Sequence, residues 1–491
     1  MSATPIADGL PTFGLLSQPY PAAVRAALHP AKPQDQFDLD PRRTAGLTDA
    51  GHAERFASEH GDRFRWDATR NLWLTWARCR WTEDRGGERH RAAVDCARNV
   101  YLLALTEQNL KRRELLSQWA IRAESRKAIE NTLELAKYVA PIADSGEPWN
   151  VDRWVLNTPG TSGLIDLRTG YDRQAKPEDR LTFATEAPFD PAAKAPTWDR
   201  FVAEVFDHNE ELIAFVQRAI GYTLTGDVRE QVFFLCYGSG ANGKSTFLDT
   251  LAWLFGDYAY ATPFSTFELN QRTTIGNDLA ALAGRRFVTA SETNAHTRLN
   301  EARIKALTGG DRMNARHLYG HPFEFHPVCK IWLSVNHRPA IGDDSFGFWR
   351  RVRLIPFVRT FTGSAEDKGL KDTLRAEASG VLNWALAGCR AWLVSGLSAP
   401  AIVTDATDAY QRDSDPLADF LDDACDFTPG AFVRAADLYA GYQAWATRQG
   451  VGEHSRDRLS RKAFGALVGR RISRDRLSDG TRGYRGVEIR R

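Results

Sequence analysis

One eight-residue segment constrains this chain more than any other. Residues 238–245 read Gly-Ser-Gly-Ala-Asn-Gly-Lys-Ser, which matches the pattern G-x-x-x-x-G-K-[ST]. The apolar run QVFFLCY precedes this segment and TFLDTLAWLF follows it, so it lies between a predicted buried strand and a predicted helix. Glycines let backbone N–H groups close around phosphate oxygens, and the helix N-terminus adds partial positive charge. The segment therefore predicts a nucleoside triphosphate site.

The residue types in this segment predict individual roles. We expect Lys244 to reach the β- and γ-phosphates and the Ser245 hydroxyl to ligate Mg²⁺. The predicted ATP-binding residues are Gly238, Ser239, Gly240, Ala241, Asn242, Gly243, Lys244, Ser245 and Thr246. The alternative without a function is a glycine-rich turn that binds no ligand. Nucleotide binding alone does not select a function, because kinases, GTPases, transporters and motors share this loop.

Two apolar runs downstream end in polar residues that suit such a site. RRFVTASET ends its strand at Ser291-Glu292, and KIWLSVNHRP carries Asn336 at the corresponding place. A carboxylate beside the loop can orient an attacking water, so Glu292 is the candidate base and a second candidate Mg²⁺ ligand. Asn336 can sense the γ-phosphate. The alternatives are a surface Glu and an Asn that only ends a strand.

Two arginines, Arg350 and Arg351, begin the last strand, VRLIPF. An arginine finger directed at the nucleotide of a neighbouring subunit fits this position. A surface ion pair with Asp343 or Asp344 is the alternative.

The four strand candidates alternate with helices, which predicts an α/β domain with a parallel sheet covered on both faces. Upstream, NLWLTWARCRW predicts a hairpin, and residues 91–140 predict two long amphipathic helices. The predicted parts are a disordered tail (1–45), a mostly helical collar domain (46–196), the parallel-sheet motor domain (197–400), an acidic linker (401–430) and a basic winged-helix-like domain (431–491).

A charge shift supports the last two boundaries. Residues 401–430 contain eight Asp and one Arg, a net charge of −7, whereas residues 431–491 carry fourteen Arg or Lys against six acids, a net charge of +8. Two predicted helices followed by a basic strand–turn–strand favour a winged helix that binds nucleic acid. Two solvated surfaces of opposite sign are the alternative.

Composition narrows the class of protein. Apolar residues make up 43% and charged residues 26% of the 491 residues, the profile of an ordinary globular chain. No apolar run reaches the roughly 18 residues that span a bilayer, so we expect no membrane contact and a cytoplasmic protein. The six cysteines form no CxxC pair, which favours reduced, buried thiols over a zinc site.

Taken together, the motifs resemble a known family. They are similar to the superfamily 3 helicases of viruses, phages and plasmids, a compact AAA+ branch, and more narrowly to the helicase part of phage and plasmid primase-helicases related to the poxvirus primase-helicase. The segments that carry the resemblance are DRWVLNTPGTSGLIDLRTG, GSGANGKST, the strand ending SET, LNEARIKALTGGDRMNARHLYGHPFEF, WLSVNHRP and FWRRVRLIPF, in an order and spacing that agree over about residues 48–400.

The resemblance implies residue roles. Glu292 is the catalytic acid, although Ser291 departs from the acidic pair of animal-virus members; Asn336 is the sensor; and Arg351 is the finger, with Arg350 as the alternative. Residues 298–325 resemble the element that ends in a DNA-contacting pore hairpin. Its tip lacks the Lys-His pair of animal-virus members, so the candidate DNA contacts are Arg316, His317, Tyr319 and His321.

The resulting hypothesis is an ATP- and Mg²⁺-dependent, ring-shaped replicative DNA helicase of a phage, prophage or plasmid, acting in the cytoplasm of a bacterial host. The resemblance implies a homo-hexamer that binds single-stranded and forked DNA. We expect no primer synthesis by this chain, so a separate primase or polymerase is an expected partner. The alternatives are an ATP-switched, origin-binding replication protein that does not unwind DNA and, less favoured, a P-loop kinase.

Overall fold

The computed structural model describes residues 46–160, 163–269, 277–292, 297–316, 318, 322–342, 345–362, 367, 369–452 and 458–490. The predicted tail 1–45 lies outside these residues. The chain divides into two compact units, and the chain passes between them after Gly61, Arg85 and Asp144. The first unit contains residues 46–61 and 86–144, and the second contains residues 62–85 and everything described from Ser145 onward. The predicted boundary at residue 196 is therefore displaced.

The first unit is helical. Its elements are α3 (Asp49–His60), α4 (Glu88–Thr106), α5 (Leu110–Ala123) and α6 (Arg126–Ala136). Three helices occupy the region where we expected two, because Asn109 and Ser125 each accept a hydrogen bond from a backbone N–H of the following turn and so begin a new helix. Val100, Leu116 and Trp119 form part of the core between α4 and α5.

The second unit begins with two small antiparallel sheets. The first contains β1 (Phe64–Asp67), β2 (Leu72–Ala77) and β3 (Arg80–Glu83), and the second contains β4 (Val155–Asn157), β5 (Leu164–Asp166) and β6 (Asp172–Arg173). The predicted hairpin is thus present, as the antiparallel pair β2–β3.

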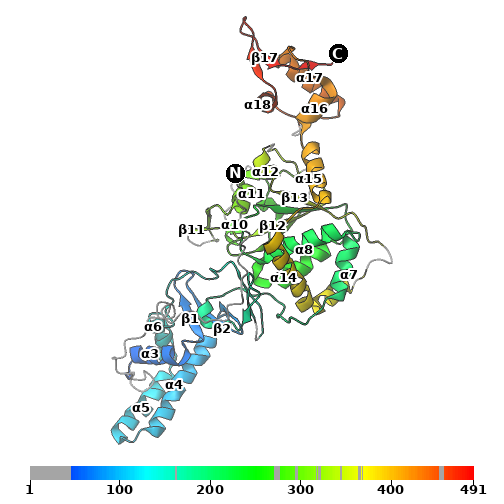
Figure 1. Cartoon of the computed structure of the whole chain (residues 1–491). Helices are drawn as coiled ribbons and strands as arrows, with labels where there is room; N and C mark the ends of the chain where they lie inside the picture. The colour runs from blue at the N-terminus through cyan, green and yellow to red at the C-terminus, as the bar shows by residue number, and fades with distance from the viewer. Residues whose placement is uncertain are drawn as a thin grey trace, which may run out of the picture. The chain divides into compact units, whose positions relative to one another are not determined.

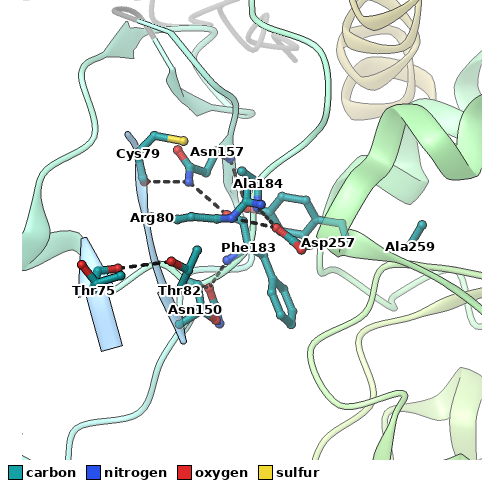
Figure 2. Close-up of polar contacts among 12 residues, drawn as sticks. Thr75, Cys79, Arg80, Thr82, Asn150, Asn157, Phe183, Ala184, Asp257 and Ala259 are labelled. Atoms are coloured by element: carbon teal, nitrogen blue, oxygen red, sulfur yellow. Dashed lines mark hydrogen bonds and ion pairs between the residues drawn. The ribbon is translucent and has the colours of Figure 1, made fainter. Parts of the chain in front are cut away.

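Polar contacts attach the β1–β3 sheet to Asn157 at the end of β4 and to the chain before β8, as Figure 2 shows. The buried Asn157 amide donates to the carbonyl oxygens of Cys79 and Phe183, at 3.0 Å each. Arg80 pairs with Asp257 at 3.1 Å. The hairpin therefore belongs to the second unit, although both of its flanking segments belong to the first.

A five-stranded parallel sheet forms the centre of the second unit (Figure 1). Its strands are β7 (Phe233–Tyr237), β8 (Ala259–Ala261), β9 (Phe287–Ser291), β12 (Lys330–Val335) and β13 (Val352–Pro356), and they lie in the order β13-β7-β12-β9-β8. Counted along the chain this order is 5-1-4-3-2. The predicted parallel sheet is confirmed, with β8 as an additional strand.

Apolar side chains cover both faces of this sheet, as expected for strands buried on two sides. Phe234 and Trp332 pack into one core with α7 (Pro196–Val205), α8 (Glu210–Leu224), α9 (Lys244–Phe255), α13 (Leu370–Ala376) and α14 (Ala378–Ser395). The intervening Phe233, Leu235 and Leu333 pack into the other core, with α11 (Glu301–Gly309), α12 (Phe346–Trp349) and α15 (Ala401–Asp413).

Shorter elements complete this part of the chain. They are η1 (Pro177–Asp179), η2 (Gly256–Tyr258), η3 (Phe264–Thr266), α10 (Asn277–Ala280) and the antiparallel pair β10 (Met313–Arg316) and β11 (Pro322–Phe325). The β10–β11 pair confirms a hairpin at the place where one was predicted.

The segment 401–430 is not a linker. Residues 401–413 form α15, whose Val403 and Tyr410 are buried, and residues 416–424 form α16 (Pro416–Ala424). Leu417, Phe420 and Leu421 of α16 belong to the C-terminal core. The acidic residues occupy the outer faces of amphipathic helices, so a count of charge hid their apolar faces.

The C-terminal domain accordingly begins at α16. Its remaining elements are β14 (Cys425–Asp426), β15 (Phe432–Arg434), α17 (Ala435–Arg448), α18 (Arg461–Arg471), β16 (Arg474–Arg476), β17 (Arg482–Arg485) and β18 (Glu488–Ile489). β15, β17 and β16 form an antiparallel sheet. Part of the basic charge is neutralised within the domain and beside it, since Arg471 pairs with Asp415 and Arg490 with Asp426.

Candidate functional site

The carboxyl end of β7 leads into the glycine-rich loop, residues 238–243, and α9 begins directly after it at Lys244. Gly240 and Gly243 have φ values of 102° and 80°, in the region that favours glycine. A Cβ at Gly243 would also lie 2.7 Å from Val205. The first N–H groups of α9 therefore face the loop without intrahelical partners, which is the arrangement that binds anions.

Lys244 is buried, with 4% of its surface exposed. Its ammonium group donates to the Gly238 carbonyl at 2.6 Å, to Asn242 Oδ1 at 2.9 Å and to Asn336 Oδ1 at 3.2 Å. Burial lowers the pKa of this lysine. These three acceptors are neutral oxygen atoms, so negatively charged phosphate oxygens can replace them and bind the ammonium group more strongly.

The other residues predicted to bind ATP lie on or beside this loop. Ser239, Ala241 and Ser245 are exposed. Asn242 is buried and donates to the Phe357 carbonyl at 3.2 Å, so its amide braces the loop as well as contacting Lys244. Thr246 is half-buried in the first turn of α9.

Glu292 follows β9, the strand next to β12. Its Oε2 accepts hydrogen bonds from the backbone N–H groups of Asn336 and His337, at 3.2 and 3.0 Å, and its Oε1 accepts one from the Thr297 hydroxyl at 3.3 Å. Since Asn336 also contacts Lys244, the structure brings three of the four predicted catalytic residues together. The sequence did not predict the contacts of Glu292 with Thr297 and His337. The His337 contact is made by a backbone N–H group and the Thr297 contact by a hydroxyl five residues away, and neither leaves a pattern in the sequence.

Arg350 and Arg351 lie at the other end of the sheet. Val352, the first residue of β13, pairs with Phe233, whereas the glycine-rich loop follows Tyr237 at the far end of β7. A five-residue strand spans about 16 Å, so Arg351 is not brought to the loop of its own chain. Arg351 donates to the Gly347 carbonyl and, at 3.4 Å, to Gln231; burial and the charge of Arg350 lower its pKa.

The predicted DNA contacts are described only in part. Arg316 is exposed at the end of β10, opposite Pro322 of β11. His317, Tyr319 and His321 lie outside the described residues, as do Asp343 and Asp344.

Two further observations concern metals and membranes. The described residues include no group of three or more His, Cys, Asp or Glu side chains arranged to hold a metal ion. In the same part of the chain, every helix is too short or too polar to cross a bilayer. The six cysteines are buried and unpaired, as predicted.

Comparisons with known proteins add to this picture of an α/β protein with a candidate nucleotide site at the carboxyl end of a parallel sheet. The model described as D5 N terminal like matches residues 53–207, and a family of unknown function, DUF5906, matches residues 236–351. The second match includes the whole glycine-rich loop. It also includes Glu292, Asn336 and Arg351.

Viral proteins are among the relatives. The chain is 26% identical over 310 residues to "Putative helicase L207/L206" of Acanthamoeba polyphaga mimivirus (58% of this chain, 32% of that protein) and 27% identical over 269 residues to "Putative helicase 022R" of Frog virus 3 (50% and 27%). It is 28% identical over 130 residues to "Putative primase C962R" of African swine fever virus (26% and 13%). The matched part thus spans a third or less of each relative. Together these matches support a protein of the D5-type primase-helicase family.

A solved structure shares the fold. The apo structure of the NrS-1 C-terminal region superposes with a TM-score of 0.50 at 10% identity, over 92% of this chain and 100% of that one.

Proposed function

We propose that this chain is an ATP-hydrolysing DNA helicase of superfamily 3 that acts as a ring in the replication of a phage, prophage or plasmid. The observation that carries the proposal is the convergence of Lys244, Asn336 and Glu292 at one end of the parallel sheet. The 5-1-4-3-2 strand order is the one expected of an AAA+ motor. The names of the viral relatives support action on DNA during replication.

In the proposed reaction, Lys244 and the N–H groups of the loop bind the phosphates of ATP. Glu292 orients the attacking water, and Asn336 holds the γ-phosphate in register with that water. The exposed Ser245 hydroxyl and the partly exposed Glu292 carboxylate fit Mg²⁺, which is held mainly by phosphate oxygens and water in such sites. Mg²⁺ would neutralise charge on the phosphates.

The position of Arg351 supports an assembled enzyme. An arginine at the amino end of the sheet fits a finger that reaches the ATP of a neighbouring copy, which requires a closed homo-oligomer such as a hexamer. The helical first unit would form its collar. The C-terminal domain, with helices followed by a β-hairpin, supports a winged helix that binds forked or duplex DNA or a replication partner. In this proposal the protein acts in the bacterial cytoplasm, and a separate primase or polymerase is its partner.

The test compares four proteins in ATPase and forked-DNA unwinding assays. Lys244→Ala should abolish both activities, because the phosphates lose their cation. Glu292→Gln should bind ATP without cleaving it. Lys371→Ala is the matched control, since Lys371 pairs with Asp249 on the surface at 2.8 Å and should leave both activities unchanged.

Two results would redirect the proposal. A wild-type protein that binds and hydrolyses ATP but never unwinds forked DNA would favour the alternative, an ATP-switched origin-binding protein. Normal hydrolysis by Glu292→Gln would remove Glu292 from its role.

A further inference from the structure

Arg338 lies two residues beyond Asn336, on the loop that leaves β12. Its guanidinium group pairs with the carboxylate of Asp413, the last residue of α15. The same group lies over the ring of Tyr237, 4.9 Å from the centroid, and 5.7 Å from that of Tyr410. Tyr237 directly precedes the glycine-rich loop. Arg338 is therefore held between the helix α15 and the strand that carries the loop.

α15 grips the same loop at a second point. The Tyr410 hydroxyl donates to the carbonyl of Pro339. Tyr410 is 1% exposed, and its ring meets Trp349 edge-on at 5.2 Å. Since this anchor is buried and aromatic, it is rigid, and Arg338 and Pro339 are both fixed relative to α15.

The other end of the loop carries the reacting groups. The Asn336 amide contacts Lys244, and the N–H groups of Asn336 and His337 hold the Glu292 carboxylate. Four consecutive residues thus connect the candidate catalytic groups on one side with α15 on the other. A shift of the loop at Arg338 moves the amide of Asn336 and the donors to Glu292 together.

We propose that Arg338 is a positioning residue for ATP hydrolysis: anchored on Asp413, it sets the loop that presents Asn336 and holds Glu292. The inference depends on the proposed ATPase activity. Asp413 is largely exposed, so the ion pair contributes little to stability. Its effect is geometric, because displacement of a catalytic group by a fraction of an ångström to 1 Å slows the chemical step strongly.

The experiment measures kcat, KM and ATP affinity for Arg338→Gln, Asp413→Asn and Arg338→Lys. Both charge-removing variants should lower kcat by about tenfold, with ATP affinity within about twofold of wild type, because binding groups are unchanged and only their alignment is lost. Arg338→Lys should restore part of kcat. Asp405→Asn is the matched control, because Asp405 is an exposed acid on the same helix.

Each other outcome overturns the inference. Wild-type kcat in Arg338→Gln would show that the loop needs no such anchor. A loss of ATP affinity in Arg338→Gln that Asp413→Asn does not share would make Arg338 a direct phosphate ligand. An absence of ATP hydrolysis in the wild type would instead refute the proposed function, so the two failures are distinguishable.

Discussion

The two ends of the parallel sheet each hold a buried lysine, and the two lysines have opposite surroundings. Lys244, at the carboxyl end, is 4% exposed, and Lys330, at the amino end, is 1% exposed. Two of the three acceptors of Lys244 are side-chain amides on loops, one of them the exposed Asn336. Lys330 donates instead to the main-chain carbonyls of Thr225 and Val328.

At the amino end of the sheet, buried basic side chains connect neighbouring elements and have a structural role. Lys330 lies 4.5 Å from the centroid of the Tyr222 ring, and the neighbouring Arg286 donates to the carbonyls of Leu224 and Val155, at 2.7 and 2.9 Å. Burial, reinforced by the charge of Arg286, places the pKa of Lys330 well below 10.5. The Arg286 and Lys330 side chains thus bind carbonyls at and just beyond the C-terminal end of α8, and Arg286 ties β4 to the sheet. The comparison teaches that burial alone does not identify a functional lysine. A functional lysine is identified by hydrogen-bond partners that a ligand can replace.

The largest expected effect concerns Arg351, which also lies at the amino end of the sheet but is expected to act in catalysis and not in structure. Arg351→Ala should bind ATP with near-normal affinity and lose on the order of 10³-fold in turnover, since a finger stabilises charge that develops in the transition state. Mixed with Lys244→Ala protein, it should regain part of its ATPase activity, because mixed rings contain sites with both intact residues.

The mixing experiment has clear contrary results. A finger acting within its own chain gives no rescue, and the two ends of the sheet would then serve one site. Rescue by Arg350→Ala, with Arg351→Ala fully active, would assign the role to Arg350.

The second prediction sharpens the comparison of the lysines through stability. Lys330→Ala should lower the free energy of unfolding by about 3 kcal/mol, because it leaves a cavity and deprives the buried Thr225 carbonyl and the half-buried Val328 carbonyl of a donor. Lys244→Ala should cost less, about 1 kcal/mol, since the amide of the exposed Asn336 can turn to water and the Asn242 amide lies on a loop. Urea unfolding of both variants measures the difference, and equal losses would contradict the distinction.

The smallest expected effect concerns a buried base without polar partners. His52 of α3 is 2% exposed, and within the described residues neither ring nitrogen has a hydrogen-bond partner. Burial, then the charge of Arg55, lowers its pKa to about 4, and Asp49 opposes this shift. The unfolded chain therefore binds the proton more tightly, so stability is complete above about pH 6.5 and falls as the pH drops toward 4.

Between pH 7 and pH 5 this loss should reach about 2 kcal/mol in the helical unit. Calorimetric melting at the two pH values measures it. His52→Leu should flatten the pH dependence, while His90→Gln, at an exposed position, should not. The same pH dependence in His52→Leu would show that other groups cause it.

Much of the central domain was predictable, and the reason is local. Four strands are apolar runs, two of which end in polar residues, and the glycine pattern places a loop between a strand and a helix. β8 was missed, because Ala259–Ala261 is three residues long and lacks an apolar run. The meeting of Glu292 with Asn336 requires that β9 lie beside β12, and strand order is a property of the assembled sheet.

Other features depend on partners distant in sequence. The charge of residues 401–430 indicated a linker, but the apolar faces of α15 and α16 pack on different cores. Arg338 carries no motif; its significance comes from Asp413, 75 residues away. The three positions at which the chain passes from one unit to the other likewise show no change in amino-acid composition that would have predicted them.

The membership of residues 62–85 in the second unit has a consequence for synthesis of the chain. The ribosome releases β1–β3 well before the segment that contains Asn157 and Phe183, and the helices α4, α5 and α6 of the first unit emerge in between. The nascent hairpin must wait, with the side chain of Trp81 and the carbonyl of Cys79 uncovered, while those helices can close around their own core. Slow elongation over residues 86–144 would prolong that exposure, so this interval is where a chaperone would protect the growing chain.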